Sequence, residues 1–120
     1  MATGKLTTHA LDLTRGRPAA GMEIELWVVR PGAEGSREKH RLKIIRLNAD
    51  GRTDAPLLSG DDFTPGVYEL VFRVGDFFGL ATADRFLDRV PIRFSITDAD
   101  AHYHVPLLTT PWAYQTYRGS

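Results

Sequence analysis

The stretch Met22–Arg30 (MEIELWVVR) decides the fold class, because apolar and charged side chains alternate along its first half. The even-numbered positions from Met22 to Val28 are apolar, whereas Glu23 and Glu25 lie between them. Successive side chains of a β-strand point to opposite faces of its sheet. The stretch therefore predicts a half-buried strand, with its apolar face in a core and both glutamates toward solvent.

Short runs that are apolar or alternate between apolar and polar residues lie on both sides of this strand and are separated by Gly, Pro, Asn and Asp. Further strands are predicted at Leu6–Leu13, His40–Leu47, Gly66–Val74, Val90–Ile96, Tyr103–Leu108 and Ala113–Arg118. One short helix is predicted at Asp76–Phe86 with Asp76 as its N-cap, and Pro91 predicts a strand start or a sheet edge. Seven or eight short strands indicate an all-β sandwich that forms a single domain over residues 1–120.

The composition is that of an ordinary globular domain without a charge bias. Fifteen Lys and Arg balance fifteen Asp and Glu, so the formal net charge is zero. This balance argues against nucleic-acid and membrane-surface partners. The chain has no cysteine, which excludes disulfides and cysteine-ligated metals, and no apolar run nears the roughly 20 residues of a membrane span. The first residues show no secretory signal, so a cytoplasmic location is expected.

Four histidines are the candidates for acid–base chemistry at neutral pH. His102 and His104 are two residues apart on a predicted strand and therefore share a face. Such a pair can chelate a metal ion or handle protons, and a strand histidine can also be a partly buried structural group. A metal site needs a third ligand, for which His9 is available but no carboxylate is obviously arranged. His40 lies among basic residues, as is typical of a solvated strand end.

For two further segments, position in the sequence alone does not indicate a function. Arg52 directly follows the turn Asp50-Gly51, and a residue there is usually solvent-facing. The chain ends on Tyr117–Ser120 (YRGS), and a chain end normally frays unless other residues hold it. From residue types alone, the sequence indicates a β-sandwich with a candidate site of histidine and arginine.

Several motifs together resemble one known family. They are Leu6–Asp12 (LTTHALD), Gly16 with Pro18-Ala19, Asp50–Arg52 (DGR), His102–Leu108 (HYHVPLL) and Tyr117–Ser120 (YRGS). Over Lys5–Ser120 the sequence is similar to the 5-hydroxyisourate hydrolases, the transthyretin-related enzymes of purine breakdown. The final tetrapeptide is the hallmark of that family, so the resemblance is specific. Departures are confined to connecting segments such as Thr109–Trp112.

The resemblance implies a fold, an assembly and an activity. The fold is a transthyretin-like β-sandwich of two four-stranded sheets with one short helix. The assembly is a homotetramer, a dimer of dimers, with active sites in the channel between the dimers. The activity is hydrolysis of the small molecule 5-hydroxyisourate, the product of urate oxidation, to 2-oxo-4-hydroxy-4-carboxy-5-ureidoimidazoline. No metal or organic cofactor is implied.

The resemblance also assigns roles to individual residues. The family's catalytic His, Arg and His match His9, Arg52 and His104, and its C-terminal Tyr and Ser match Tyr117 and Ser120. The substrate is then expected to contact His9, Arg52 and the two C-terminal residues. These residue types suit ring opening, because a neutral imidazole can accept a proton from water and a guanidinium can bind an oxyanion. A second imidazole can protonate the leaving nitrogen, and which histidine is base and which is acid stays open.

Two other functions are compatible with a sandwich of this size. A transthyretin-like carrier of a small aromatic molecule would share the fold without catalysis, but it lacks the His–Arg–His set and the Tyr-Arg-Gly-Ser ending, both of which this chain has. A sandwich that binds a metal ion through His102 and His104 is the other alternative.

Overall fold

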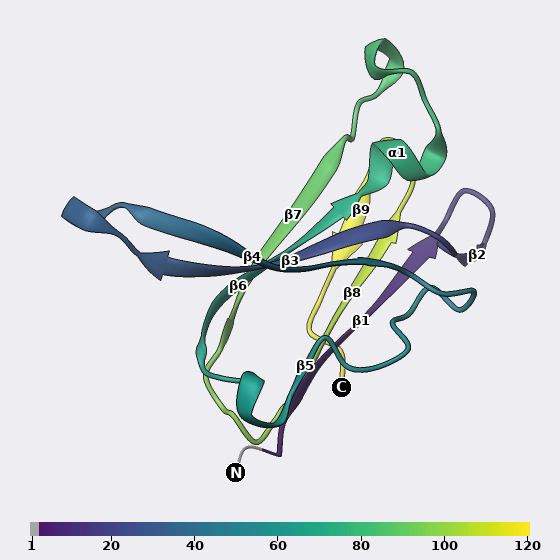
Figure 1. Cartoon of the computed structure of the whole chain (residues 1–120). Coiled ribbons are helices and arrows are strands. Elements are labelled where there is room, and N and C mark those ends of the chain that lie inside the picture. The colour runs from purple at the N-terminus through teal and green to yellow at the C-terminus, as the bar shows by residue number, and fades with distance from the viewer. Residues whose placement is uncertain (1–2) are drawn as a thin grey trace.

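Two stacked β-sheets make up residues 3–120, the part of the chain that the computed structural model describes (Figure 1). One sheet contains, in spatial order, β2 (Arg17–Pro18), β1 (Lys5–Asp12), β8 (His102–Thr109) and β9 (Tyr114–Thr116), and β5 (Leu58–Ser59) also pairs with β1. The other contains β4 (Arg37–Arg46), β3 (Glu23–Pro31), β6 (Gly66–Arg73) and β7 (Arg89–Ile96). The helix α1 (Val74–Phe78) and the 3-10 turns Ala33–Gly35, Gly60–Asp62 and Thr82–Asp84 lie in the connections. Residues 1–2 of the expected domain lie outside the described residues.

The predicted all-β sandwich is confirmed, and the described chain has a single short α-helix. The sheet of β3 has the four strands that the resemblance implies. The sheet of β1 has a fifth strand, because Leu58 and Ser59 pair with Leu6 and Lys5. β7, the strand that contains Pro91, lies at a sheet edge as predicted. A proline is tolerated there because an edge strand leaves one row of backbone groups unpaired.

The helix differs from the prediction in its position and its cap. It spans Val74–Phe78 rather than Asp76–Phe86, so Asp76 lies inside its first turn. The N-cap is Arg73, whose side chain makes no capping hydrogen bond, and the helix ends at Gly79 with a φ of 70°. Glycine adopts this left-handed conformation readily and so stops a helix early. Within residues 3–120, no helix is long and apolar enough to cross a membrane.

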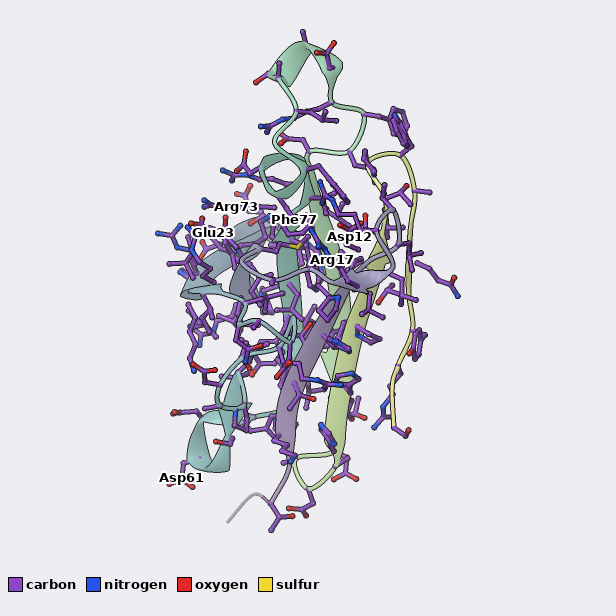
Figure 2. The ribbon with its side chains drawn as sticks, turned by 90° about the vertical axis from the view of Figure 1, so that its right-hand side faces the viewer. Asp12, Arg17, Glu23, Asp61, Arg73 and Phe77 are labelled. Atoms are coloured by element: carbon purple, nitrogen blue, oxygen red, sulfur yellow. The ribbon has the colours of Figure 1, made fainter. Side chains whose placement is uncertain are left out.

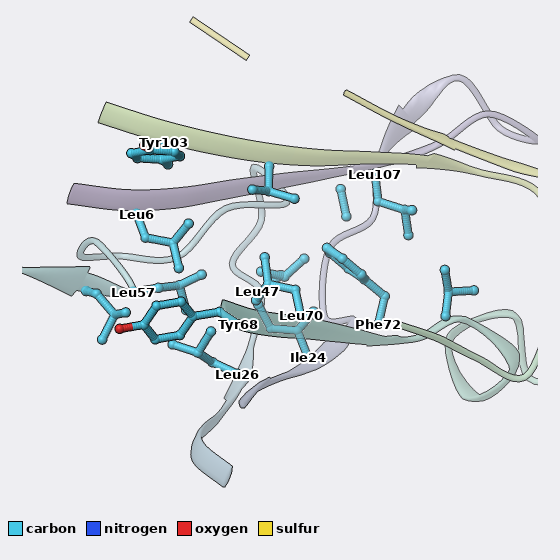
Figure 3. Close-up of a cluster of buried hydrophobic side chains, with 14 of the residues drawn as sticks. Leu6, Ile24, Leu26, Leu47, Leu57, Tyr68, Leu70, Phe72, Tyr103 and Leu107 are labelled. Carbon is cyan, nitrogen blue, oxygen red and sulfur yellow. The ribbon is translucent and has the colours of Figure 1, made fainter. Parts of the chain in front are cut away.

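Apolar side chains from both sheets fill the space between them (Figure 3). The most deeply buried, each at most 1% exposed, include Leu6, Leu107, Ile24, Leu26, Leu70 and Phe72. Burial of one such side chain contributes about 1.5–3 kcal/mol, so this shared core holds the two layers together. The outer faces of the sheets are left for polar side chains.

Glu25 corrects the prediction for β3, because its carboxylate is covered rather than solvent-facing. It lies on the outer face, as alternation predicts, yet it is only 2% exposed. Arg73 donates its Nε–H to Glu25 Oε2 at 2.8 Å, and Trp27 donates its Nε1–H to Oε1 at 2.9 Å. Arg73 also donates to Glu23 Oε2 at 2.8 Å, and Figure 2 shows these two residues side by side. Long neighbouring side chains therefore bury Glu25, which the alternation of a single strand does not reveal.

Acid should weaken the fold through Glu25. Burial disfavours its charged form, but hydrogen bonds from Arg73 and Trp27 and the charges of Arg73 and Arg89 outweigh burial and lower the pKa of Glu25. A carboxyl with a lowered folded-state pKa stabilises the fold above its unfolded-state pKa, and this contribution is lost as the pH falls through the folded-state pKa. We expect Glu25→Gln to reduce the free energy of unfolding by about 1–3 kcal/mol near neutral pH. The deficit should shrink in acid, as urea denaturation at a series of pH values will measure.

The matched control is Glu34→Gln, which changes an exposed carboxylate on a 3-10 turn. It should leave the free energy of unfolding nearly unchanged at every pH. A Glu25→Gln deficit of constant size from neutral to acidic pH would contradict the role assigned to this carboxylate.

Candidate active site

The outer face of the first sheet carries the predicted histidines, because β1 and β8 run parallel beside each other (Figure 1). In this register Thr7 is the partner of His104, and His9 is the partner of Pro106. Burial along β1 alternates between buried and half-buried residues after its first position. Thr7 and His9 are half-buried, so they point away from the core on the same face as His102 and His104. Strands from opposite ends of the described chain thus supply one site.

Arg52 reaches this face through the turn that follows β4. Asn48 closes the turn, because its Oδ1 accepts the backbone N–H of Asp50 at 2.9 Å and of Arg52 at 3.1 Å. The turn is fixed to β1 by the Ala10 N–H, which donates to the Gly51 carbonyl at 2.9 Å. Gly51 has a φ of 71°, and a Cβ added to it would lie 2.5 Å from the Ala10 carbonyl oxygen. The glycine of the Asp-Gly-Arg motif is therefore required for the turn to approach the strand.

Burial and the charge of Arg52 both favour the neutral form of the two imidazoles. Burial lowers the pKa of His9 and the positive charge of Arg52 lowers it further, against a raising effect from a hydrogen bond to the Asp50 backbone and from the Asp50 charge. Burial also lowers the pKa of His104, as do Arg52, His102 and His9. Arg52 acts on both rings, so the structure brings His9, Arg52 and His104 together. Two proton acceptors and one permanent cation share one patch.

Thr7 is a functional candidate that the sequence analysis missed. Its Oγ1 lies 2.6 Å from Nε2 of His102 and 2.8 Å from Nδ1 of His104. The alternation of β1 places Thr7 on the same face as His9, two residues earlier. That signal was available, but the parallel pairing of β1 with β8 was not, so the contact with both histidines could not be inferred.

The C-terminal residues are attached to β8 rather than frayed. The Gly119 N–H donates to the His104 carbonyl at 2.7 Å in an antiparallel bridge. The Arg118 guanidinium lies over the ring of Tyr103, 4.2 Å from its centroid. A Cβ added to Gly119 would lie 3.0 Å from both Cβ and Cγ of His104, so only glycine allows this approach. Ser120, which follows Gly119, is thereby held near the strand of His104.

The other predicted residues lie farther from the three-residue cluster or in the other sheet. Tyr117 is half-exposed and lines a pocket with Phe94, Tyr103 and Val105. His40 lies on β4 of the other sheet, with its Nε2 3.7 Å from Glu38 Oε2. In residues 3–120, no group of three or more His, Asp or Glu side chains is arranged to hold a metal ion. His102 and His104 instead share the Thr7 hydroxyl.

Comparisons with known proteins match nearly the whole chain. The model of the HIUase/Transthyretin family matches residues 6–119. The protein named 5-hydroxyisourate hydrolase 2 of Rhizobium meliloti (strain 1021) is 49% identical over 122 residues, which cover 98% of each chain. A crystal structure of (S)-allantoin synthase has a TM-score of 0.88 and 41% identity over 99% of this chain, which spans only 44% of that chain. A transthyretin from Sparus aurata has a TM-score of 0.80 with 22% identity over 96% of each chain, a likeness of fold alone.

Gly119→Ala should displace the His104 imidazole from Thr7 while the fold survives. The added methyl group would occupy space that the His104 side chain now fills, and this ring can turn outward because it is only half-buried. We expect the His104 imidazole resonances in NMR spectra to shift, and the free energy of unfolding to change by no more than about 1 kcal/mol. Gln115→Ala, at an exposed position of β9, is the control and should leave those resonances in place. Unchanged His104 resonances in Gly119→Ala would refute the close approach.

Proposed function

The chain belongs to the HIUase/transthyretin family, and we propose that it is a 5-hydroxyisourate hydrolase of urate breakdown. It hydrolyses 5-hydroxyisourate to 2-oxo-4-hydroxy-4-carboxy-5-ureidoimidazoline. The observation that carries this proposal is the cluster of two imidazoles with lowered pKa values, His9 and His104, beside the guanidinium of Arg52. The name of relatives that match nearly the whole chain supports the same reaction.

The chemistry of the product defines what the site must do. A carboxyl and a ureido group arise when water breaks the C–N bond of a ring amide. Water adds its oxygen to the carbonyl carbon and gives up a proton, the carbonyl oxygen becomes an oxyanion, and the leaving nitrogen takes a proton. A guanidinium is a permanent cation with paired N–H donors, so Arg52 can hold the oxyanion. One imidazole receives the proton of the water and the other supplies a proton to the nitrogen.

His9 is suited to be the base. The backbone of Asp50 favours a proton on the His9 ring, as a carbonyl oxygen beside one ring nitrogen does. A backbone carbonyl can only accept, so this contact holds the imidazole N–H and leaves a lone pair on the other nitrogen. A positioned base of this kind contributes about 10²–10⁴-fold to a rate. Because side chains supply every step, the proposal includes no metal and no organic cofactor.

Tyr117 and Ser120 are proposed as substrate contacts. The bridge between Gly119 and His104 supports this for Ser120, which follows Gly119 directly. Tyr117 has an apolar ring and one polar tip, a combination that suits a flat polar heterocycle. Ser120 follows the residue that is bridged to His104, and Tyr117 lines the pocket with Phe94 and Tyr103. Neither takes part in proton transfer in this proposal.

We also propose that the active form is a homotetramer, a dimer of dimers with its sites between dimers. The edge strands β7 and β9 have unpaired backbone groups in the single chain, and such edges are usually covered. Trp112 and Tyr114 expose 66% and 45% of their surface near β9, although large aromatic side chains are favoured in protein interfaces. The absence of cysteine is compatible with the reducing cytoplasm, which we propose as its location.

A carrier protein with the same fold is the competing function. The likeness to a transthyretin shows that the sandwich alone does not decide between them. A carrier has no use for a cation that lowers the pKa of two neighbouring imidazoles, whereas amide hydrolysis uses both effects. The cluster therefore favours the enzyme.

Removal of any member of the cluster should abolish most of the activity. We expect His9→Ala, Arg52→Ala and His104→Ala each to lower kcat/KM by about 10²–10⁴-fold. The assay generates 5-hydroxyisourate from urate with a urate oxidase and follows its ultraviolet decay. His40→Ala, in the other sheet, is the control and should retain full activity. Decay that the wild-type protein does not accelerate, or that a chelator returns to the spontaneous rate, would overturn the proposed reaction.

The proposed tetramer can be tested by measuring the mass of the protein in solution. Light scattering on a sizing column should give about four times the chain mass of 13.4 kDa. Trp112→Ser with Tyr114→Ser should shift the mass distribution toward smaller species, because the pair exposes large apolar surface in the single chain. A wild-type protein that is fully active as a monomer would exclude sites between dimers.

A further inference from the structure

The Thr7 hydroxyl lies between two imidazoles, one exposed and one in the active-site cluster. Its Oγ1 is 2.6 Å from Nε2 of His102 and 2.8 Å from Nδ1 of His104. The ring centroids of the two histidines are 6.1 Å apart, and His102 is the exposed member. Because Nδ1 of His104 is held by Thr7, its Nε2 is the nitrogen left for the substrate. The three groups form a continuous path from solvent to the site.

Hydrogen-bond chemistry permits only two arrangements of protons when both rings are neutral. A hydroxyl carries one proton, and a neutral imidazole carries one N–H and one lone pair. In the first arrangement Thr7 donates to Nδ1 of His104, so the proton of His104 is on Nε2, and His102 donates to Thr7. In the second every bond is reversed, and Nε2 of His104 has a lone pair. One shift along the path therefore changes His104 from a donor to an acceptor at the reacting atom.

The charge of Arg52 creates a difficulty that this path can remove. A general acid is usually an imidazolium, but burial and Arg52 both oppose a positive charge on His104. A neutral imidazole is a very weak acid on its own. It becomes an effective one when its second nitrogen gains a proton as the first loses one, because the ring then stays neutral.

We propose that Thr7 and His102 form a proton relay that makes His104 the general acid of ring opening, an inference that rests on the proposed function. His102, at the exposed end, exchanges protons with solvent through Nδ1. As the C–N bond breaks, Nε2 of His104 gives its proton to the leaving nitrogen, Thr7 gives its proton to Nδ1 of His104, and Nε2 of His102 gives its proton to Thr7. Nδ1 of His102 takes a proton from a solvent acid as Nε2 loses one, so His104, Thr7 and His102 all end neutral. The proton that water lost is on His9, and both histidines then exchange protons with solvent.

Other charged groups near the relay are compatible with this direction of transfer. Those that border the two imidazoles are Lys5 and His9 of β1 and Arg52 of the turn, and Asp50 acts on His9. Lys5 is the strand partner of His102. Arg52 acts on His104 and stabilises the neutral ring that the relay preserves.

The decisive comparison is Thr7→Val against Thr7→Ser. Valine has the shape of threonine without the hydroxyl, so it breaks the relay, whereas serine keeps the hydroxyl. We expect Thr7→Val to lower kcat by about tenfold or more with KM within about twofold, and Thr7→Ser to recover most of that loss. In Thr7→Val, His104 must itself be charged to act as acid. The kcat of this variant should therefore fall as the pH rises through the lowered pKa of His104, a fall that the relay spares the wild-type protein. Thr82→Val, on an exposed 3-10 turn, is the matched control.

His102→Gln tests the other end of the relay at an exposed position, where folding is not at risk. It should lower kcat by a factor similar to that of Thr7→Val, and the double variant should be no slower than either single variant, because both changes interrupt one path. His40→Gln is the control histidine. An NMR measurement without substrate adds an independent readout: the ¹⁵N shift of Nδ1 in His104 should change in Thr7→Val and return in Thr7→Ser.

The outcomes separate the relay from the proposed function. If the wild-type protein does not accelerate 5-hydroxyisourate decay, the proposed function fails. If the wild-type protein is active and Thr7→Val is equally fast, the relay is wrong. The relay is also wrong if Thr7→Ser is as slow as Thr7→Val, or if the double variant multiplies the losses of the single ones. A Thr7→Val protein that fails to fold leaves His102→Gln to decide, and full activity of that variant overturns the relay.

Discussion

The parallel pairing of β1 with β8 is the contact on which the rest of the structure depends. It runs over eight residue pairs, from Lys5 with His102 to Asp12 with Thr109. The other strand pairs in residues 3–120 are antiparallel. This pairing closes a loop of nearly the whole described chain, and the entropy lost in closing it must be offset by many simultaneous contacts. The inward side chains of both strands supply those contacts through the shared core.

The same pairing fixes the core and the site with one register. Along β1 and β8 the residues that face inward, such as Leu6 and Leu107, alternate with those that face outward, such as Thr7 and His104. A slip of one residue in either strand would turn its apolar side chains to solvent and its polar ones into the core. The core thus stabilises the single register in which Thr7 meets His104. Packing in the interior in this way sets the geometry of the contact between Thr7 and His104 on the surface.

The sequence predicts features that depend on local patterns, and it does not predict those that depend on contacts between distant segments. Alternation in Met22–Arg30 correctly predicts β3, because one strand carries its own signal. Glu25 was wrongly expected in solvent, since Arg73 of a neighbouring strand buries it. The position of Arg52 depends on a bond between Ala10 and Gly51 that no local pattern contains, and only family resemblance pointed to that arginine. The Thr7 contact likewise needs the partner strand to be known.

The positive charge of Arg52 has two opposite electrostatic effects on the proposed reaction: it stabilises an oxyanion, and it opposes a positive charge on His104. Arg52 is exposed in the single chain, so water screens its charge and weakens its hold on an oxyanion. Covering the site would strengthen every electrostatic interaction in it and would also raise the cost of charging His104. The first effect helps catalysis and the second would remove an imidazolium acid. A path through Thr7 resolves this conflict, because protons can reach His104 without charging it. Because the cluster is exposed to solvent in a single chain, a second copy of the chain that covers it would strengthen its electrostatic interactions. A covered site would then need a proton path that still reaches solvent, which Thr7 and His102 provide in this proposal.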